Sequence, residues 1–506
     1  MDNSTTKKIV TYLLNKKILV APDLIQTLGS ASTCPADLLG LFSNDHERES
    51  FLEYITPHLP LPVVQMHHHP IVSLVSPPHA PLQHADQIRA PQCKIIFTYT
   101  GETKKRTVED FVSFYTKRYE SLRGILQVRK ELEDSLSISR VLAKNEKEKA
   151  SIIGMVKSKA ETKNKNIMLE LEDPTGIIKV ILNKTRPDLF RVAKEIFLDE
   201  VIGITGKTGN KIIFADNIIY PDIPHRELKK LDYDCGAVFT SDLHIGSKQF
   251  LEESFLRFIS WLNGEEGDEH QHEMVKKLKY VFLLGDVVDG VGVYPGQEED
   301  LAIRDVYAQY EQLATYLKKI PPHLRIIICP GNHDAVRLAE PQPVLSKEYA
   351  PTLYTLPNVT LVSSPSFIRL EESDTFSGFD ILVYHGCSFD YFIAESNAIR
   401  EAGGYDRADL VMTMLLKRRH LAPTHNATQS IPDPQCDPMV IEKVPDFFTV
   451  GHLHKATAAQ YKHVTLICAS CWQGKTAYQE KVGHIPDPGR VFYADLRTRK
   501  IKILKF

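Results

Sequence analysis

The sequence predicts a multi-domain α/β protein (α+β over its full length), in which a small helical domain and a β-barrel precede a C-terminal layered β-sandwich domain. Three observations support this prediction. The length of 506 residues exceeds the ~250–300 residues at which one hydrophobic core stops growing. A central segment holds a series of short β-like runs with one helix among them. In the C-terminal half, short apolar strands instead alternate with helical stretches, as in layered α/β domains.

The first 92 residues divide into two segments of different composition. Residues 1–56 place apolar side chains at helical spacing and predict a small helical N-terminal domain. Residues 57–92 are rich in proline and histidine, including His67, His68 and His69. Proline fixes φ and removes a backbone donor, so we expect this Pro/His-rich stretch to be an extended linker rather than a metal site.

Residues 93–134 are predicted to form a strand followed by a connecting helix. The run KIIFTYT favours a strand, and apolar residues recur at helical spacing after Thr107. Thr107 and Asp110 have the three-residue spacing of a helix N-cap motif, so we expect the helix to begin there.

Residues 135–226 are predicted to form an OB-fold barrel. The runs SIIGMVKS, NIMLELE, GIIKVIL, VIGITGK and IIFADNIIY favour strands, and PDLFRVAKEIF favours a helix after the third of them, which matches OB-fold order. Many OB-folds bind single-stranded nucleic acid through basic grooves and aromatic stacking, but these strands carry few aromatic residues. Two roles therefore remain open: DNA binding by Lys157, Lys159, Lys163 and Lys165, and a structural or subunit-docking role.

Charge and composition narrow the class of protein. A formal net charge of -3 and a pI near 6.7 exclude a uniformly basic nucleic-acid coat, although they allow a local basic surface. No apolar run approaches the ~18 residues of a membrane span, and the N-terminus lacks the pattern of a signal peptide. Eight scattered cysteines do not suit a disulfide framework. We therefore expect a cytoplasmic protein without membrane association.

Residues 233–506 carry the residues that suit chemistry. GAVFT, YVFLLG, LRIIICP, DILVYHG and DFFTVGH are short apolar runs, and each leads directly into a polar cluster with glycines beside it. Loops at strand C-termini build the site in layered α/β domains. Carboxylate, imidazole and amide oxygen donors together suit manganese, iron, zinc or nickel, and their fixed order argues against ordinary loop residues. The clusters are Asp242 with His244, Asp286 with Asp289, Asn332 with His333, His385, and His452 with His454.

These clusters resemble the calcineurin-like metallophosphoesterase superfamily over roughly residues 235–475, and every position of that pattern is filled. The resemblance implies two divalent metal ions and assigns a ligand set to each. One ion would be held by Asp242, His244, Asp286 and His454. The other would be held by Asp286, Asn332, His385 and His452, so that Asp286 bridges both.

The same resemblance implies two catalytic residues. His333 would lie over the phosphate, and Asp289 would orient its ring. Two cations neutralise a phosphodiester anion and activate water, while a bridging carboxylate fixes their separation. His333 could then stabilise or protonate the leaving oxygen. The sequence therefore predicts hydrolysis of a phosphodiester bond.

The stretches FTSDLHIGSKQF, YPGQEEDL and GNHDAVRLAEPQP, joined to an upstream OB-like segment, resemble the small subunit of archaeal family D DNA polymerase. That family implies a manganese-stimulated, proofreading 3′→5′ exonuclease that acts on single-stranded DNA and primer 3′ ends at the archaeal nucleoid. It implies a large catalytic polymerase subunit as the heterodimer partner, and a sliding clamp is a further candidate partner. One departure is Cys387, at a position where a basic residue is expected.

Two other classes of function stay open. A catalytically silent scaffold subunit would use the same domains as docking surfaces, and alanine at Asp286 or His333 would then leave every activity intact. A stand-alone phosphoprotein phosphatase or cyclic-nucleotide phosphodiesterase would have no need of the OB-like segment. The complete ligand set favours a live nuclease over both alternatives.

Overall fold

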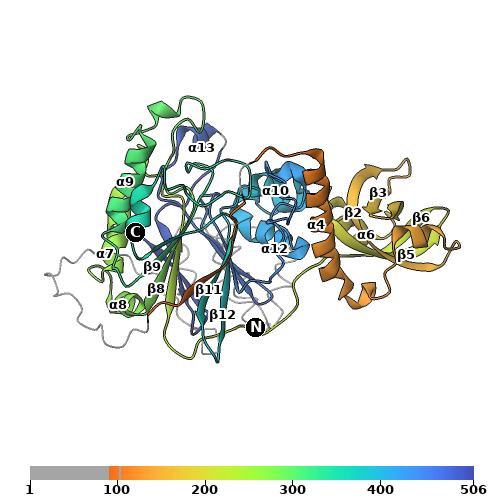
Figure 1. Ribbon diagram of the computed structural model, residues 1–506, viewed down its shortest axis with the longest axis horizontal. Coiled ribbons are helices and arrows are strands. Elements are labelled where there is room, and N and C mark those ends of the chain that lie inside the picture. Colours follow the sequence, from red (N-terminus) through yellow and green to blue (C-terminus); the bar gives the residue numbers. More distant parts are fainter. Residues whose placement is uncertain (1–89, 102–103, 482) are drawn as a thin grey trace, which may run out of the picture. The chain divides into compact units, whose positions relative to one another are not determined.

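The computed structural model describes residues 90–101, 104–481 and 483–506. The helical domain expected over residues 1–56 and residues 57–89 of the expected linker lie outside the described residues. The described part forms two six-stranded sheets and a closed five-stranded barrel, with helices packed against them (Figure 1). The predicted α/β multi-domain class is therefore confirmed for this part of the chain.

The C-terminal domain is built on two sheets. β7, β8 and β9 of one sheet are parallel to one another, as are β12 and β13 of the other, so the C-terminal ends of each set lie at one edge. The first sheet contains, in order, β1 (Cys93–Thr98), β11 (Ser366–Glu372), β12 (Ser377–Val383), β13 (Phe447–Val450), β15 (Val464–Cys468) and β14 (Thr457–Tyr461). The second contains β10 (Val359–Leu361), β9 (Arg325–Cys329), β8 (Leu278–Leu284), β7 (Gly236–Thr240), β16 (Arg490–Asp495) and β17 (Ile501–Lys505).

Large apolar side chains fill the space between these two sheets. Phe239 of β7 stacks on Phe282 of β8 with ring centroids 4.8 Å apart. Phe447 of β13, in the opposite sheet, lies 6.0 Å from Phe239, and all three rings are fully buried. Burial of one such ring stabilises the fold by ~1.5–3 kcal/mol. This shared core holds the two sheets together as a sandwich.

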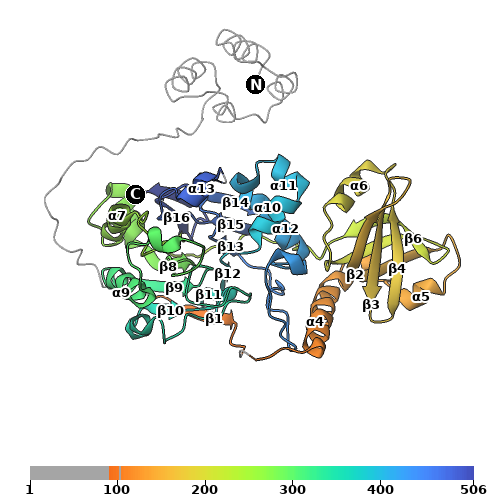
Figure 2. The same cartoon turned by 90° about the horizontal axis from the view of Figure 1, so that it is seen from above.

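Helices cover the outer face of each sheet. Figure 2 shows α7 and α9 on one side of the strands and α10 and α12 on the other. Within the described part of the chain, none of the helices combines the length and the apolar character needed to cross a bilayer. The helices on the second sheet are α7 (Glu252–Leu262), α8 (Glu269–Lys276) and α9 (Val306–Leu317). Those on the first are α10 (Phe389–Glu395) and α12 (Ala408–Arg418).

The strand expected near residue 93 belongs to the first sheet of the C-terminal domain. β1 pairs antiparallel with β11, with Cys93 opposite Leu370 and Thr98 opposite Ser366. The chain then runs through α4 (Val108–Gln127) and the barrel before it returns to the sandwich at β7. The barrel is therefore an insertion between two strands of the C-terminal domain.

The barrel has the predicted OB-fold order. Its strands close in the order β2-β3-β4-β6-β5, and a helix follows the third strand. Alternate residues of β3 point inward, which buries Leu169 and Leu171 completely, as the two-residue period of a strand requires. The elements are β2 (Lys149–Glu161), β3 (Ile167–Asp173), β4 (Gly176–Leu182), α6 (Pro187–Lys194), β5 (Val201–Gly209) and β6 (Ile212–Ile219).

Helix α4 connects the barrel to the C-terminal domain. It begins at the predicted N-cap, where the Thr107 amide donates to Asp110 at 2.9 Å in a capping box. Leu122 of α4 packs against the barrel. On the same helix, buried Arg118 donates from Nε to Asp437 of the C-terminal domain at 2.6 Å. One helix therefore contacts both domains.

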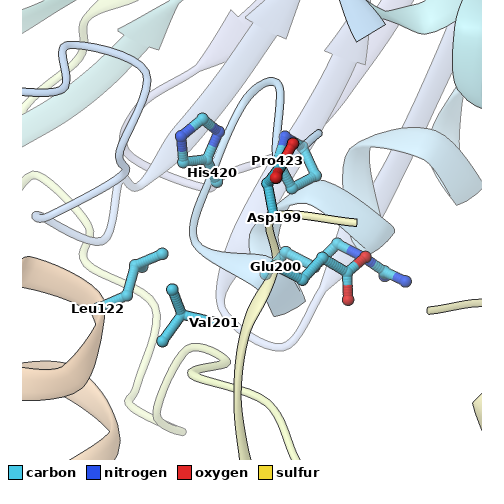
Figure 3. A pocket seen from close by; sticks show the side chains of 7 residues that line it. Leu122, Asp199, Glu200, Val201, His420 and Pro423 are labelled. Atoms are coloured by element: carbon cyan, nitrogen blue, oxygen red, sulfur yellow. The ribbon is translucent and has the colours of Figure 1, made fainter. Parts of the chain in front are cut away.

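A second buried ion pair joins the barrel directly to the C-terminal domain. Arg418, at the end of α12, donates to Glu200, which lies just before β5. The Arg418 guanidinium also lies 5.0 Å from the centroid of the Tyr220 ring. Figure 3 shows this region, where α4, the barrel and the C-terminal domain line one small pocket. Removal of one partner would leave an uncompensated buried charge at a cost of ~3–5 kcal/mol, so both partners are needed at this contact.

Candidate metal centre

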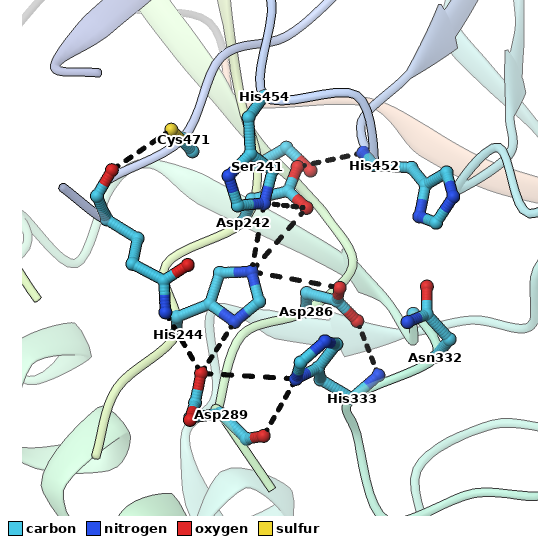
Figure 4. A network of polar contacts seen from close by, with 12 residues as sticks. Ser241, Asp242, His244, Asp286, Asp289, Asn332, His333, His452, His454 and Cys471 are labelled. Carbon is cyan, nitrogen blue, oxygen red and sulfur yellow. Dashed lines mark hydrogen bonds and ion pairs between the residues drawn. The ribbon is translucent and has the colours of Figure 1, made fainter. Parts of the chain in front are cut away.

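The predicted ligands converge at the C-terminal ends of five strands. Asp242, Asp286 and Asn332 follow β7, β8 and β9 of the second sheet. His385 and His452 follow β12 and β13 of the first sheet. Figure 4 shows Asp242, Asp286, Asn332 and His452 around one common space between the loops. The sandwich therefore brings together ligands from both of its sheets.

Glycines let the ligand loops approach one another closely. A Cβ at Gly285 would lie 2.3 Å from Nδ1 of His385, and one at Gly331 would lie 2.2 Å from Oδ1 of Asp286. Neither distance is sterically tolerable, so a larger residue at either position would displace a predicted ligand. Gly285 also has a φ of +95°, a conformation that favours glycine.

Five of the predicted ligands have left-handed backbone conformations. φ is +51° at Asp242, +50° at His244, +49° at Asp286, +68° at His452 and +54° at His454. Such a conformation costs ~1–3 kcal/mol for a residue with a side chain and persists only where the surrounding structure imposes it. The ligand loops are therefore held in a geometry that local preference does not favour.

Asp242, His244 and His454 form the first group of candidate ligand atoms, which lie within 4.8 Å of one another. Asp242 Oδ1 is 3.4 Å from His454 Nε2 and 3.9 Å from His244 Nε2. This oxygen is buried and has no hydrogen-bond partner among the described residues. A buried carboxylate oxygen is costly without a partner, and a cation would supply one. A divalent metal ion therefore fits this position.

Asp286, His385 and His452 form the second group, whose ligand atoms also lie within 4.8 Å of one another. His385 Nε2 is 3.3 Å from Asp286 Oδ2 and 3.2 Å from Asn332 Oδ1. The same Asp286 oxygen is 3.8 Å from His244 Nε2 in the first group. One carboxylate therefore faces both groups, as a bridging ligand must.

Three of the predicted histidine ligands are anchored through the ring nitrogen that faces away from the ligand groups. His244 Nδ1 donates to the Asp289 carboxylate at 2.9 Å, and His452 Nε2 donates to the Asp390 carboxylate at 2.7 Å. His385 Nδ1 donates to a main-chain carbonyl at 2.8 Å. Such bonds fix the tautomer and leave the other nitrogen with its lone pair, which a metal-binding histidine requires. The donor set is therefore arranged for divalent ions.

Asp289 contacts His333 and His244 through different atoms. His333 Nδ1 donates to the Asp289 main-chain carbonyl at 2.9 Å, whereas it lies 3.9 Å from the carboxylate. The carboxylate accepts instead from His244, and from the side-chain amides of Gln297 and Gln473 at 3.1 Å each. Asp289 therefore orients His333 with its backbone and His244 with its side chain.

The electrostatics of the centre arise from buried carboxylates close to imidazoles. Burial raises the pKa of Asp286, but the neighbouring imidazoles of His385 and His333 outweigh burial and hold that pKa well below its usual range. Burial lowers the pKa of His385, yet the Asp286 carboxylate raises it to about 10, so a cation bound there would displace the proton from Nε2. Burial lowers the pKa of His333. The centre thus gathers ionised carboxylates that a divalent cation would neutralise.

Sequence reasoning missed three residues that hold the centre together. Asp390 lies in the run FDYF without a motif to mark it, and Gln473 lies far along the chain from the aspartate that it contacts. Asp334 accepts from the amides of Gly331 at 2.8 Å and Val288 at 3.3 Å, and so ties two ligand loops together. Asp334 adjoins a predicted catalytic histidine, but its inward direction follows only from packing.

Comparisons with known proteins place this architecture in a family. The sequence pattern of the B-subunits of DNA polymerases alpha and epsilon matches residues 237–459, and one described as "OB-fold nucleic acid binding domain" matches residues 150–214. The "DNA polymerase II small subunit" of Methanothermobacter thermautotrophicus is 37% identical over 415 residues, which cover 81% of this chain and 83% of that protein. The chain belongs to the DNA polymerase II small-subunit family.

Two further small subunits show the same degree of similarity. That of Archaeoglobus fulgidus is 38% identical over 399 residues, or 79% of this chain and 78% of that protein. That of Pyrococcus furiosus is 39% identical over 411 residues, or 80% of this chain and 65% of that protein. The resemblance to archaeal polymerase small subunits is therefore confirmed. In this member of the small-subunit family, Cys387 lies with Sγ 3.9 Å from Asn332 Oδ1, beside the second ligand group.

Proposed function

We propose that this small subunit is a two-metal 3′→5′ exonuclease that removes nucleotides from single-stranded DNA ends. The observation that carries the proposal is the pair of ligand groups, buried except for His452, that face the shared Asp286 carboxylate. Two divalent cations there would neutralise the phosphodiester and activate water, with manganese expected in activity and iron, zinc or nickel as alternatives. The residues that would hold them are Asp242, His244 and His454 for one ion, Asn332, His385 and His452 for the other, and Asp286 for both.

His333 would act on the leaving group. Its ring lies 4.6 Å from that of His244, and its side chain is 18% exposed, so a substrate can reach it beside the buried ligands. Because Nδ1 donates to the Asp289 carbonyl, Nε2 is the atom left to act on the departing 3′ oxygen, and it can pass a proton only when the ring is an imidazolium that carries a proton on both nitrogens. Proton transfer of this kind contributes about 10²–10⁴-fold to the rate.

The barrel lysines favour a docking role for the barrel. Lys159 donates to the carbonyl of Ile196 at 2.9 Å. Lys157 pairs with Glu172 at 3.4 Å, and Lys165 is also paired with a glutamate, at 2.8 Å. The glutamates beside Lys157 and Lys165 offset part of the positive charge that a single-strand groove would need, and the Lys159 ammonium is held by a main-chain carbonyl. Of the two roles left open for the barrel, we therefore propose subunit docking, with the DNA end bound at the metal centre.

The partner we propose is a large polymerase subunit that carries out DNA synthesis. The relatives carry the name "DNA polymerase II small subunit", which supports a heterodimer with a larger chain. A sliding clamp would be an additional contact of that complex. Proofreading follows from this arrangement, because the nuclease and the synthetic subunit would then act on the same primer 3′ end.

The first test is digestion of single-stranded oligonucleotides by the full-length chain with manganese. A 5′-labelled oligonucleotide should shorten stepwise, and a 3′-labelled one should release its label at once as a mononucleotide. His333→Ala is expected to lower the rate by about 10²–10⁴-fold. The matched control is His323→Ala, because His323 is exposed and precedes β9, at the opposite end of that strand from the centre.

Two outcomes would contradict the proposal. If the wild type digests neither oligonucleotide, even with the large subunit present, the centre is silent and the chain is a scaffold. If the wild type hydrolyses a phosphopeptide faster than DNA, the centre belongs to a different phosphoesterase. Equal loss of activity in His333→Ala and His323→Ala would leave the nuclease unassigned to this centre.

A further inference from the structure

Two aromatic side chains lie beside the ligand groups but outside the ligand set. Tyr405 belongs to the short 3-10 helix Gly404–Arg407, and His484 lies in the loop after α13 (Ala477–Lys481). Their rings make an edge-to-face contact with centroids 5.1 Å apart. Figure 2 shows α13 near α10 and α11 (Asn397–Glu401), which agrees with this contact between distant parts of the sequence.

Hydrogen bonds connect Tyr405 to the second ligand group. The Tyr405 hydroxyl donates to Asp390 Oδ1 at 2.8 Å, and Asp390 Oδ2 accepts from His452 Nε2 at 2.7 Å. A single carboxylate therefore separates the tyrosine from a predicted metal ligand. The segment that carries His484 reaches the first ligand group, because the Gln479 side-chain amide lies 3.0 Å from His454 Nδ1 and the Asp487 amide donates to the His454 carbonyl at 2.8 Å. The aromatic pair thus extends alongside both ligand groups.

This part of the rim presents apolar surface to solvent. Tyr405 is 40% exposed although its hydroxyl is bound, and the neighbouring Ile485 is 65% exposed. The predicted ligands Asp242 and His385, by contrast, are completely buried. Exposed apolar side chains beside a buried polar centre suit a ligand that combines both characters. A nucleotide combines both characters, because its phosphate can bind at the polar centre and its flat base can stack on the aromatic rings.

We propose that Tyr405 and His484 form a stacking site for the nucleobase next to the scissile phosphate. This inference rests on the proposed nuclease function and narrows its substrate to phosphodiesters that carry a base at that position. Aromatic stacking accepts every base, because each has a π face, and it is worth about tenfold or more in affinity per base. If Tyr405 only tied its 3-10 helix to α10, cleavage would not depend on the base.

The test compares intact oligonucleotides with oligonucleotides that are abasic at the terminal or the penultimate 3′ position. Cleavage by the full-length chain is measured with manganese, and binding is measured in EDTA by fluorescence anisotropy. The wild type should prefer the intact strand by about tenfold at one of the two positions. Tyr405→Leu should lose this preference, whereas Tyr405→Phe should keep it, since the ring remains. Loss of the Tyr405 hydroxyl can also disturb Asp390, but that disturbance affects the cleavage of both substrates equally and so leaves the ratio of their rates unchanged.

Tyr354→Leu provides the matched control. Tyr354 is 45% exposed and its hydroxyl is also bound, to the Leu345 carbonyl, but it lies in the 3-10 helix Pro351–Thr355. This variant should keep the wild-type ratio. Equal treatment of intact and abasic strands by the wild type, or an unchanged ratio in Tyr405→Leu, would overturn the stacking site. A preference in EDTA without any cleavage would support the stacking site and reject the nuclease, so the two failures can be told apart.

Discussion

Buried charge is arranged differently at the metal centre and at the contact of α4 with the C-terminal domain. At the contact, Asp437 accepts from Arg118 at 2.6 Å, from His420 at 2.9 Å and from the Met439 amide at 3.0 Å. At the centre, Asp242 is just as deeply buried, but its Oδ1 has no hydrogen-bond partner among the described residues. The chain supplies every partner in the first case and leaves one place open in the second.

This difference separates a structural carboxylate from a candidate ligand. Both aspartates are buried and both lie near histidines, so neither burial nor composition distinguishes them. Asp242 combines an open acceptor with a left-handed backbone, with a φ of +51°, whereas Asp437 has neither feature. Strain and missing partners are tolerated where a bound group repays them.

The largest effect is expected at Asp286, which faces both ligand groups. Asp286→Asn removes the shared charge while nearly keeping the shape of the side chain. Loss of several kcal/mol of transition-state stabilisation corresponds to a fall of at least about a thousandfold in manganese-dependent cleavage. Manganese should also raise the melting temperature of the wild type but not that of the variant. Cleavage within about tenfold of the wild type would refute the shared-ligand assignment.

The second-largest effect is expected at Asp437, at the contact of α4 with the C-terminal domain. Burial raises the pKa of Asp437, but Arg118 and His420 outweigh burial and hold it well below its usual range. Asp437→Ala leaves buried Arg118 unpaired and should lower the free energy of unfolding by ~3–5 kcal/mol in urea titrations. The folded variant should still cleave DNA. Asp188→Ala, at a barrel aspartate whose side chain is 92% exposed, should cost less than ~0.5 kcal/mol.

Glu340 is a buried carboxylate that lies outside both the metal centre and the contact of α4 with the C-terminal domain. It is completely buried, accepts from the Tyr384 hydroxyl at 3.0 Å, and its Oε1 has no hydrogen-bond partner among the described residues. Burial raises the pKa of Glu340 to about 7. In the unfolded chain the group ionises near pH ~4.3. The folded state therefore binds more protons between these values, so this group's contribution to stability is lost as the pH rises through the window.

Glu340→Gln should remove that dependence on pH. Relative to the variant, the wild type should lose up to about 3 kcal/mol of unfolding free energy between pH ~4 and pH ~8, on the scale of 1.36 kcal/mol per pKa unit. Urea titrations of both proteins across this range provide the measurement. A difference between the two proteins that stays constant with pH would show that Glu340 ionises normally in the folded state.

The smallest effect is expected at Asp390, which touches the centre only through His452. Asp390→Asn should weaken manganese binding by about 10–100-fold, because the imidazole loses its anionic acceptor. A titration of melting temperature against manganese concentration measures this change. Asp374→Asn is the control, since Asp374 is an exposed aspartate of the same domain. Equal manganese affinity in both variants would remove Asp390 from the set of positioning residues.

Local pattern predicted much of the fold. The run GAVFT coincides with β7 and VYAQYEQLATYL with α9, because the length and period of an apolar run are set within a few residues. The clustering of the candidate ligands was predicted for a related reason, since Asp242, Asp286, Asn332, His385 and His452 each follow the end of a strand. Residues at the C-terminal ends of parallel strands must share an edge, whatever the rest of the fold does.

Contacts across the sequence could not be predicted in this way. Asp390 and Gln473 hold His452 and Asp289 in place, but only packing shows that their side chains reach them. The strand near residue 93 was expected, whereas its pairing with β11 was not, because register between distant strands leaves no local signal. The role of the Asp289 carboxylate toward His244 rather than His333 likewise depends on side-chain direction.

The position of β1 in the sequence also affects how the chain folds during synthesis and where it can be truncated. During synthesis β1 leaves the ribosome well before β11, and the barrel, whose paired strands are closer in sequence, can form in the interval. We therefore expect β1 to pair with β11 only after the barrel has been synthesised. A fragment that starts after the barrel would lack β1 and leave the β11 edge open to strands of other molecules. A nuclease fragment that keeps β11 paired as in the full chain must therefore begin before Cys93.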